Sequence, residues 1–224
     1  MNRGVSAALR GWSAVALVLA AVARSASAQD STAVARLDPT SRAAVEQTIA
    51  DARASGLPTA PLTSKVAEGI TKGASGTRIV SVVRALAEAM AEARGALGPN
   101  SSAAELVAGA GALHAGVDRD ALARLRGAEP GRPVTMPLVV LADLVTRGVP
   151  SDTAAAAVLQ LSRRGATDVD FASLRRDVVR DIATGTPAAA AATMRARQFV
   201  PVSTAGEGRP PGQPPPPGPE PPGV

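Results

Sequence analysis

The residues most suggestive of chemistry lie in the stretch 68–78, which reads "EGITKGASGTR" and combines glycines, a lysine and hydroxyl side chains. A phosphate loop needs the order G-x-x-x-x-G-K-[ST] after a strand, so that backbone N–H groups surround the phosphate and the lysine reaches it. Here Lys72 precedes Gly73, and we expect no strand before Glu68. The stretch therefore predicts a joint in which Gly73 ends one helix and Ser75 caps the next. An anion held by the free N–H groups of that second helix is the alternative.

Histidine and cysteine chemistry is almost absent from the sequence. His114 is the only histidine and there is no cysteine, so neither a zinc site built from these residues nor a cysteine nucleophile is available. His114 lies two residues before Gly116, at the expected end of a helix, where an imidazolium interacts favourably with the helix dipole. No serine lies in a nucleophile-elbow motif. We therefore predict no catalytic, cofactor-binding or metal-binding residues.

Paired carboxylates are the remaining candidates for acid–base or divalent-ion chemistry. Four pairs are close in the sequence: Glu88 with Glu92, Asp118 with Asp120, Asp168 with Asp170, and Asp177 with Asp181. Two acids four residues apart share a helix face and can act together. However, Arg84 precedes Glu88 by four residues and Arg180 follows Asp177 by three, which is typical of charge ladders on a solvated helix. A carboxylate-dependent hydrolase of the cell envelope is kept as an alternative function.

Arginine clusters offer a possible anion-binding face in the last third of the chain. The candidate residues are Arg163, Arg164, Arg175, Arg176 and Arg180. Guanidinium groups bind anions in a bidentate manner, so phosphate, acidic glycans or anionic lipid head groups would suit this face. Several aspartates interleave with these arginines, and a solvated face of mixed charge is the competing interpretation.

The N-terminal residues 1–28 are predicted to be a secretory signal peptide. Basic residues precede an apolar run at residues 13–23, and a small-residue cleavage site with Ala26 and Ala28 follows, so Gln29 is the expected first mature residue. The run is shorter than the roughly 20 residues that a membrane-spanning helix needs. We therefore expect a periplasmic or extracellular protein with no transmembrane span in the mature chain.

The mature chain would be nearly neutral. Three of the 24 basic residues leave with the signal, so 21 basic residues face 19 acidic ones. This balance gives little support for a polyanion partner, and only Phe171 and Phe199 would remain to stack on bases, so we predict no nucleic-acid partner. Without disulfides or further aromatic residues, the core must be built from Leu, Val, Ile, Met and Ala.

A recurring pattern organises the middle of the chain. A helical stretch ends at a glycine, a small or apolar residue follows, and then comes Ser, Thr or Asp, at Gly56, Gly73, Gly116, Gly148 and Gly165. Glycine suits the left-handed C′ position, the next residue packs back on the helix, and the polar residue caps the following helix. The expected helices cover residues 39–54, 60–72, 76–95, 102–115, 119–126, 136–147, 152–164, 169–183 and 187–197.

These patterns predict an all-α domain over residues 38–198. Short helices joined by tight turns cannot bury their apolar faces alone, so we expect an array of about eight to nine antiparallel helices, a degenerate helical repeat, with an irregular bundle as the alternative. A flexible lead at 29–37 and a disordered tail at 199–224, rich in proline and glycine, are expected to flank the domain.

The sequence favours a non-enzymatic exported protein that binds a protein or an envelope component. The alternatives are the carboxylate-dependent hydrolase and a binder of anionic lipid or polyanion that uses the region 163–180. A deep pocket with converging carboxylates would favour the hydrolase, whereas a shallow apolar groove would favour a binding protein.

Overall fold

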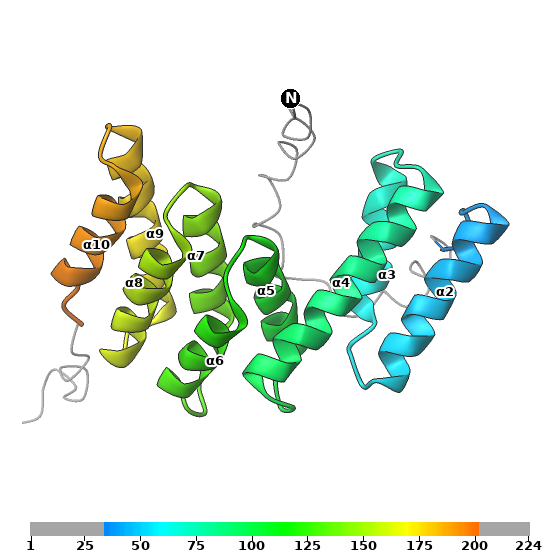
Figure 1. The fold of residues 1–224 in the computed structure, drawn as a ribbon, viewed down its shortest axis with the longest axis horizontal. Coiled ribbons are helices and arrows are strands. Elements are labelled where there is room, and N and C mark those ends of the chain that lie inside the picture. The colour runs from blue at the N-terminus through cyan, green and yellow to red at the C-terminus, as the bar shows by residue number, and fades with distance from the viewer. Residues whose placement is uncertain (1–33, 202–224) are drawn as a thin grey trace, which may run out of the picture.

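The computed structural model describes residues 34–201, which contain nine α-helices and no strand (Figure 1). The helices are α2 Pro39–Ala54, α3 Ala60–Thr71, α4 Gly76–Leu97, α5 Ala103–His114, α6 Arg119–Ala128, α7 Thr135–Thr146, α8 Ser151–Arg163, α9 Asp168–Ala183 and α10 Ala188–Gln198. The all-α class is confirmed, and every helix begins and ends within two residues of its expected bounds. The predicted signal peptide, its cleavage site at Ala26, Ala28 and Gln29, and the tail residues 202–224 lie outside the described residues.

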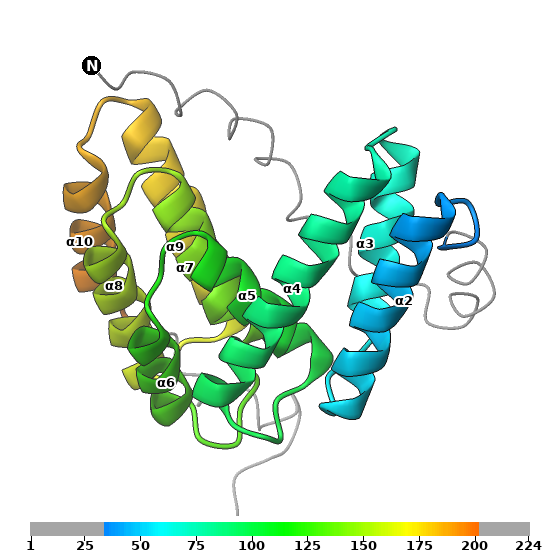
Figure 2. The same cartoon turned by 45° about the vertical axis from the view of Figure 1, so that its right-hand side comes forward.

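The helices follow one another along an elongated array, from α2 at one end to α10 at the other (Figures 1 and 2). In one layer α2, α4, α6, α8 and α10 each contact the next member, and in the other α5 contacts α7 and α7 contacts α9. The pairs α3 with α4, α4 with α5, α7 with α8, and α9 with α10 connect the layers. Most helices therefore contact the helix two positions later in the sequence. Stacked helix pairs produce this pattern, because each pair buries its apolar face on the next pair.

Two clusters of buried apolar side chains fill the array. One lies among α2, α3 and most of the length of α4, with part of α5, and includes Leu62, Val83 and Met90. The other runs from the end of α4 to α10 and includes Leu138 and Phe171. Helices α4 and α5 contribute to both clusters, so this pair joins the two parts of the array.

The joint at Gly73 illustrates how the predicted turns are built. Gly73 has φ of +66°, and the N–H of Ala74 donates to the carbonyl of Gly69 at 2.9 Å, which is the long bond of a Schellman motif. Ser75 then caps α4, since its Oγ accepts the N–H of Arg78 at 3.4 Å. The helix joint predicted from "EGITKGASGTR" is therefore confirmed. The other predicted joints, at Gly56, Gly116, Gly148 and Gly165, also have positive φ.

Two of the predicted caps are wrong. Thr59 makes no side-chain bond at the start of α3. At the start of α8 the N-cap position is occupied by Pro150, so Ser151 already lies within the helix and its buried Oγ has no partner among the described residues. A proline at N-cap leaves the first N–H groups of α8 without a side-chain acceptor.

The packed core extends beyond the expected domain ends. Val34 and Leu37, in the segment predicted to be a flexible lead, are buried with the side chains of α2 and α3. Arg42 fastens this segment by donating to the carbonyl of Leu37 at 3.1 Å. At the other end, Phe199 packs partly buried against the larger cluster, although the tail was predicted to begin there. Each end therefore uses apolar side chains to cover an otherwise exposed terminal helix.

Candidate functional site

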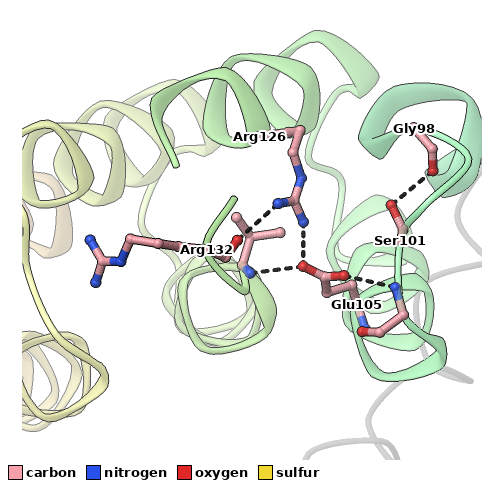
Figure 3. Close-up of polar contacts among 7 residues, drawn as sticks. Gly98, Ser101, Glu105, Arg126 and Arg132 are labelled. Carbon is pink, nitrogen blue, oxygen red and sulfur yellow. Dashed lines mark hydrogen bonds and ion pairs between the residues drawn. The ribbon is translucent and has the colours of Figure 1, made fainter. Parts of the chain in front are cut away.

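The most extensive polar cluster in the described part of the chain surrounds the buried carboxylate of Glu105, in the first turn of α5 (Figure 3). One oxygen of Glu105 accepts the N–H of Ser102 at 2.8 Å and completes a capping box. The other accepts the N–H of Val134 at 3.0 Å and an ion-pair hydrogen bond from Arg126. A single carboxylate thus joins the start of α5, the end of α6 and the start of α7.

The surroundings of Glu105 stabilise its charged form. Burial alone would raise its pKa, but the N–H groups of Val134 and Ser102 and the guanidinium of Arg126 outweigh that effect and hold the pKa at about 2, against an ordinary value of 4.5. Such a carboxylate stays ionised at neutral pH and cannot act as a general acid there. The cluster therefore suits a structural role, in which charge holds three chain segments in register.

The loop between α6 and α7 connects this cluster to the turn between α8 and α9. Arg126 donates to the carbonyl of Arg132 at 2.9 Å, and Arg132 pairs with the buried Glu129 at 3.0 Å. Arg132 also donates to the carbonyl of Ala166, in the turn between α8 and α9, at 2.9 Å. The two buried carboxylates are matched by two arginines, so the cluster carries no net charge with which to attract an ionic ligand.

Two adjacent hollows on either side of α8, which we call the α8 grooves, are the candidate binding site. The first lies between α6 and α8 over Leu141 of α7, has a volume of about 200 Å³, and includes Arg124 and Asp152. The second lies between α8 and α10, has a volume of about 280 Å³, and includes Gln160. Asp152 and Ala156 line both, and Asp152 is the one carboxylate in either lining.

The α8 grooves do not resemble an acid–base active site. General acid–base chemistry on a bound substrate usually needs two acid or base groups that converge on one point, and neither groove contains a second carboxylate or a histidine besides Asp152. Apolar and small side chains form most of the walls, including Leu125, Val158 and Leu159. Their arrangement can bury apolar side chains of a partner, with Arg124 and Asp152 at hand for ionic contacts.

The carboxylate pairs noted in the sequence mostly have local structural roles. Asp118 caps α6, Asp170 accepts the N–H and hydroxyl of Thr167 at the start of α9, and Asp177 pairs with Arg180. Glu88 and Glu92 lie exposed on α4. Within residues 34–201 no group of three or more Asp, Glu, His or Cys side chains could hold a metal ion.

Asp181 forms a bidentate ion pair with Arg195, at 2.6 and 2.7 Å, and so connects α9 to α10. The hydrogen bonds from Arg195 lower the pKa of Asp181, and the carboxylate in turn raises the pKa of Arg195. No spacing rule within one helix pairs these residues, because they belong to different helices. The pair fastens the last helix to the array.

The five arginines of the predicted anion-binding face are spread over the end of α8 and along α9: Arg163, Arg164, Arg175, Arg176 and Arg180. Arg164 donates to the carbonyl of Phe199 at 2.6 Å, and Arg180 pairs with Asp177. These two side chains have separate partners, one directly after α10 and the other on α9. Binding of an anion by this face stays a prediction.

The polar groups of the stretch 68–78 bond largely to one another. Glu68 accepts hydrogen bonds from Lys65 and Lys72, and these bonds lower its pKa. Ser75 is occupied as the cap of α4. His114 is the exposed last residue of α5, as the helix-end interpretation predicts.

Comparison with models of known protein families, with curated proteins and with solved structures found no match for this chain. Between residues 34 and 201, no helix has both the length and the apolar character required to cross a membrane.

Proposed function

We propose that this protein is exported and acts without catalysis, as a helical module that binds a protein or another component of the cell envelope. The observation that carries the proposal is the character of the α8 grooves, which are small, apolar in most of their lining, and provided with only one carboxylate, Asp152. Volumes of about 200 and 280 Å³ fall below the range of roughly 300–1,000 Å³ that is usual for small-molecule sites. Surfaces of this kind suit contact with a macromolecule.

The elongated array supports the same proposal. Stacked helices present an extended face on which several helices contribute contacts, and here α6, α8 and α10 lie side by side in one layer. A carboxylate-dependent hydrolase is less well supported, because the two buried carboxylates, Glu105 and Glu129, are both paired with arginines. The anion-binding alternative would require the arginines of α8 and α9 to act together, and Arg164 and Arg180 are engaged elsewhere.

Crosslinking in the producing cell tests the proposal. A photoreactive residue at Ala156, which is exposed and lines both grooves, should give a discrete adduct in the envelope or medium fraction. The same residue at Ala91, exposed on α4, is the matched control. N-terminal sequencing of the recovered chain tests export, since Gln29 is the expected first residue. An unprocessed intracellular chain, or adducts equal to those of an unrelated exported protein, would contradict the proposal.

A further inference from the structure

We infer that the partner element seated on the α8 grooves is an amphipathic helix that carries an acidic side chain to meet Arg124 and a basic side chain to meet Asp152. This inference rests on the proposed binding function and specifies the partner's chemistry. Three observations support it: the position of the grooves, the size of each hollow, and two groove charges that form no ion pair among the described residues.

The grooves run on both sides of α8, whose middle carries only small side chains at the outer surface. Ala156 is exposed and Ala155 half-buried at the outer surface of α8, between the walls formed by α6 and α10. Helices pack with axes about 8–10 Å apart when the side chains between them are small. A partner helix can therefore lie along α8 and place side chains one turn apart into the hollows on its two sides.

The size of each groove favours separate side chains over one bulky ligand. The first groove, of about 200 Å³, has Leu125, Leu141 and Leu159 in its lining and so presents an apolar floor and walls. The second, of about 280 Å³, is also largely apolar, with Ala157 and Ala196 in its lining beside Thr153 and Gln160. An amphipathic helix suits two apolar hollows, because its apolar residues recur every three to four positions and polar ones flank them.

Two opposite charges line the first groove, and one of them, Asp152, also lies in the first turn of α8, where a carboxylate suits the helix dipole. Arg124 on α6 and Asp152 on α8 are exposed, and neither side chain forms an ion pair or hydrogen bond with any residue between 34 and 201. By contrast, Arg195, Arg126 and Asp181 are all engaged between helices. Opposite charges beside an apolar groove fix the direction of a partner that carries the complementary pair, since a reversed helix would bring like charges together.

Selection from a displayed library of helical peptides, with the full chain as the bait, tests the inference directly. The expected peptides have Leu or Met at helical spacing and an acid and a base at fixed positions beside them. Ala156→Arg should block both grooves and weaken binding of the selected peptides by about ten-fold or more, whereas Ala91→Arg on α4 should leave it unchanged.

A charge reversal makes the test specific. Selection on Arg124→Glu should replace the acid in the winning peptides by Lys or Arg at the same position. The inference is overturned if no peptide family is enriched, if extended or proline-rich peptides are enriched instead, or if binding ignores Ala156→Arg. Any of these results could coexist with a crosslinked partner in the cell, in which case the proposed function would survive and only the helical occupant of the α8 grooves would be lost.

Discussion

The cluster around Glu105 predicts a specific pH dependence of folding. The folded-state pKa of Glu105 is about 2 and its ordinary value is 4.5, so the ionised carboxylate stabilises the fold by about 3 kcal/mol at neutral pH, at roughly 1.4 kcal/mol per pKa unit. Because the folded pKa is the lower of the two, this stabilisation is complete above the unfolded pKa. It is lost as the pH falls from about 4.5 towards 2.

Glu105→Gln isolates this contribution, because glutamine keeps the shape of the side chain and never ionises. We expect the variant to unfold with a free energy about 3 kcal/mol lower than the wild type at pH 7, and the gap to shrink to less than half of that at pH 3. Urea unfolding of both proteins at a series of pH values measures the gap, and other carboxylates cancel in the comparison. Glu92→Gln, at an exposed position on α4, is the control and should show no gap at any pH.

The result that would refute this reasoning is a gap that does not change with pH. It would mean that glutamine destabilises the fold through its shape or its amide N–H groups, and that the charge of Glu105 is no better stabilised in the folded protein than in the unfolded one. A gap that grew at low pH would be a stronger contradiction, since it would require a raised pKa.

Three further predictions concern packing and helix connections. Gly109→Ala should lower the free energy of unfolding by about 1–3 kcal/mol, because the new Cβ would lie 2.9 Å from Cβ of Ala93. Gly111→Ala, whose new Cβ meets no atom within 4 Å, should raise it by about 0.5–1 kcal/mol. Changes of the same sign for both variants in urea unfolding would contradict the packing of α4 on α5. Ser162→Ala should raise the unfolding free energy by about 1 kcal/mol in the same assay, because the buried Oγ has no partner among the described residues; a loss would indicate a bridging water. Arg195→Met should increase the rate of amide hydrogen exchange in α10 while α2 keeps its protection. Unchanged exchange in α10 would show that the ion pair with Asp181 does not hold α10 in place.

The local rules of the sequence account for most of the architecture. The glycine at each joint, the cap at Ser75 and the capping box of Ser102 with Glu105 are interactions between residues within a few positions of one another, so spacing alone predicts them. The failures at Thr59 and Ser151 are also local. Thr59 has the αR backbone conformation, whereas a capping residue is normally extended, and Pro150 takes the N-cap position that Ser151 was expected to occupy.

The site was much less predictable, because it depends on contacts between distant segments. Glu105 was visible as the second residue of a capping box, but Arg126 and Val134, its other partners, come from two later elements. Likewise, Arg195 reaches Asp181 across a turn, and no spacing rule for a single helix pairs them. The α8 grooves had no sequence signal at all, since their lining residues come from α6, α7, α8 and α10.

The shortage of aromatic side chains connects the composition of the chain with the form of its surface. Aromatic residues make up 1% of the sequence, so most contacts between helices are made by Ala, Val and Leu. Small side chains let helices approach closely, as at Gly109, and leave narrow hollows at the surface in place of deep pockets. A partner of such a surface gains affinity from several shallow contacts along a helix, each backed by the layer of α6, α8 and α10, and its direction from Arg124 and Asp152, two groove charges that form no internal ion pair.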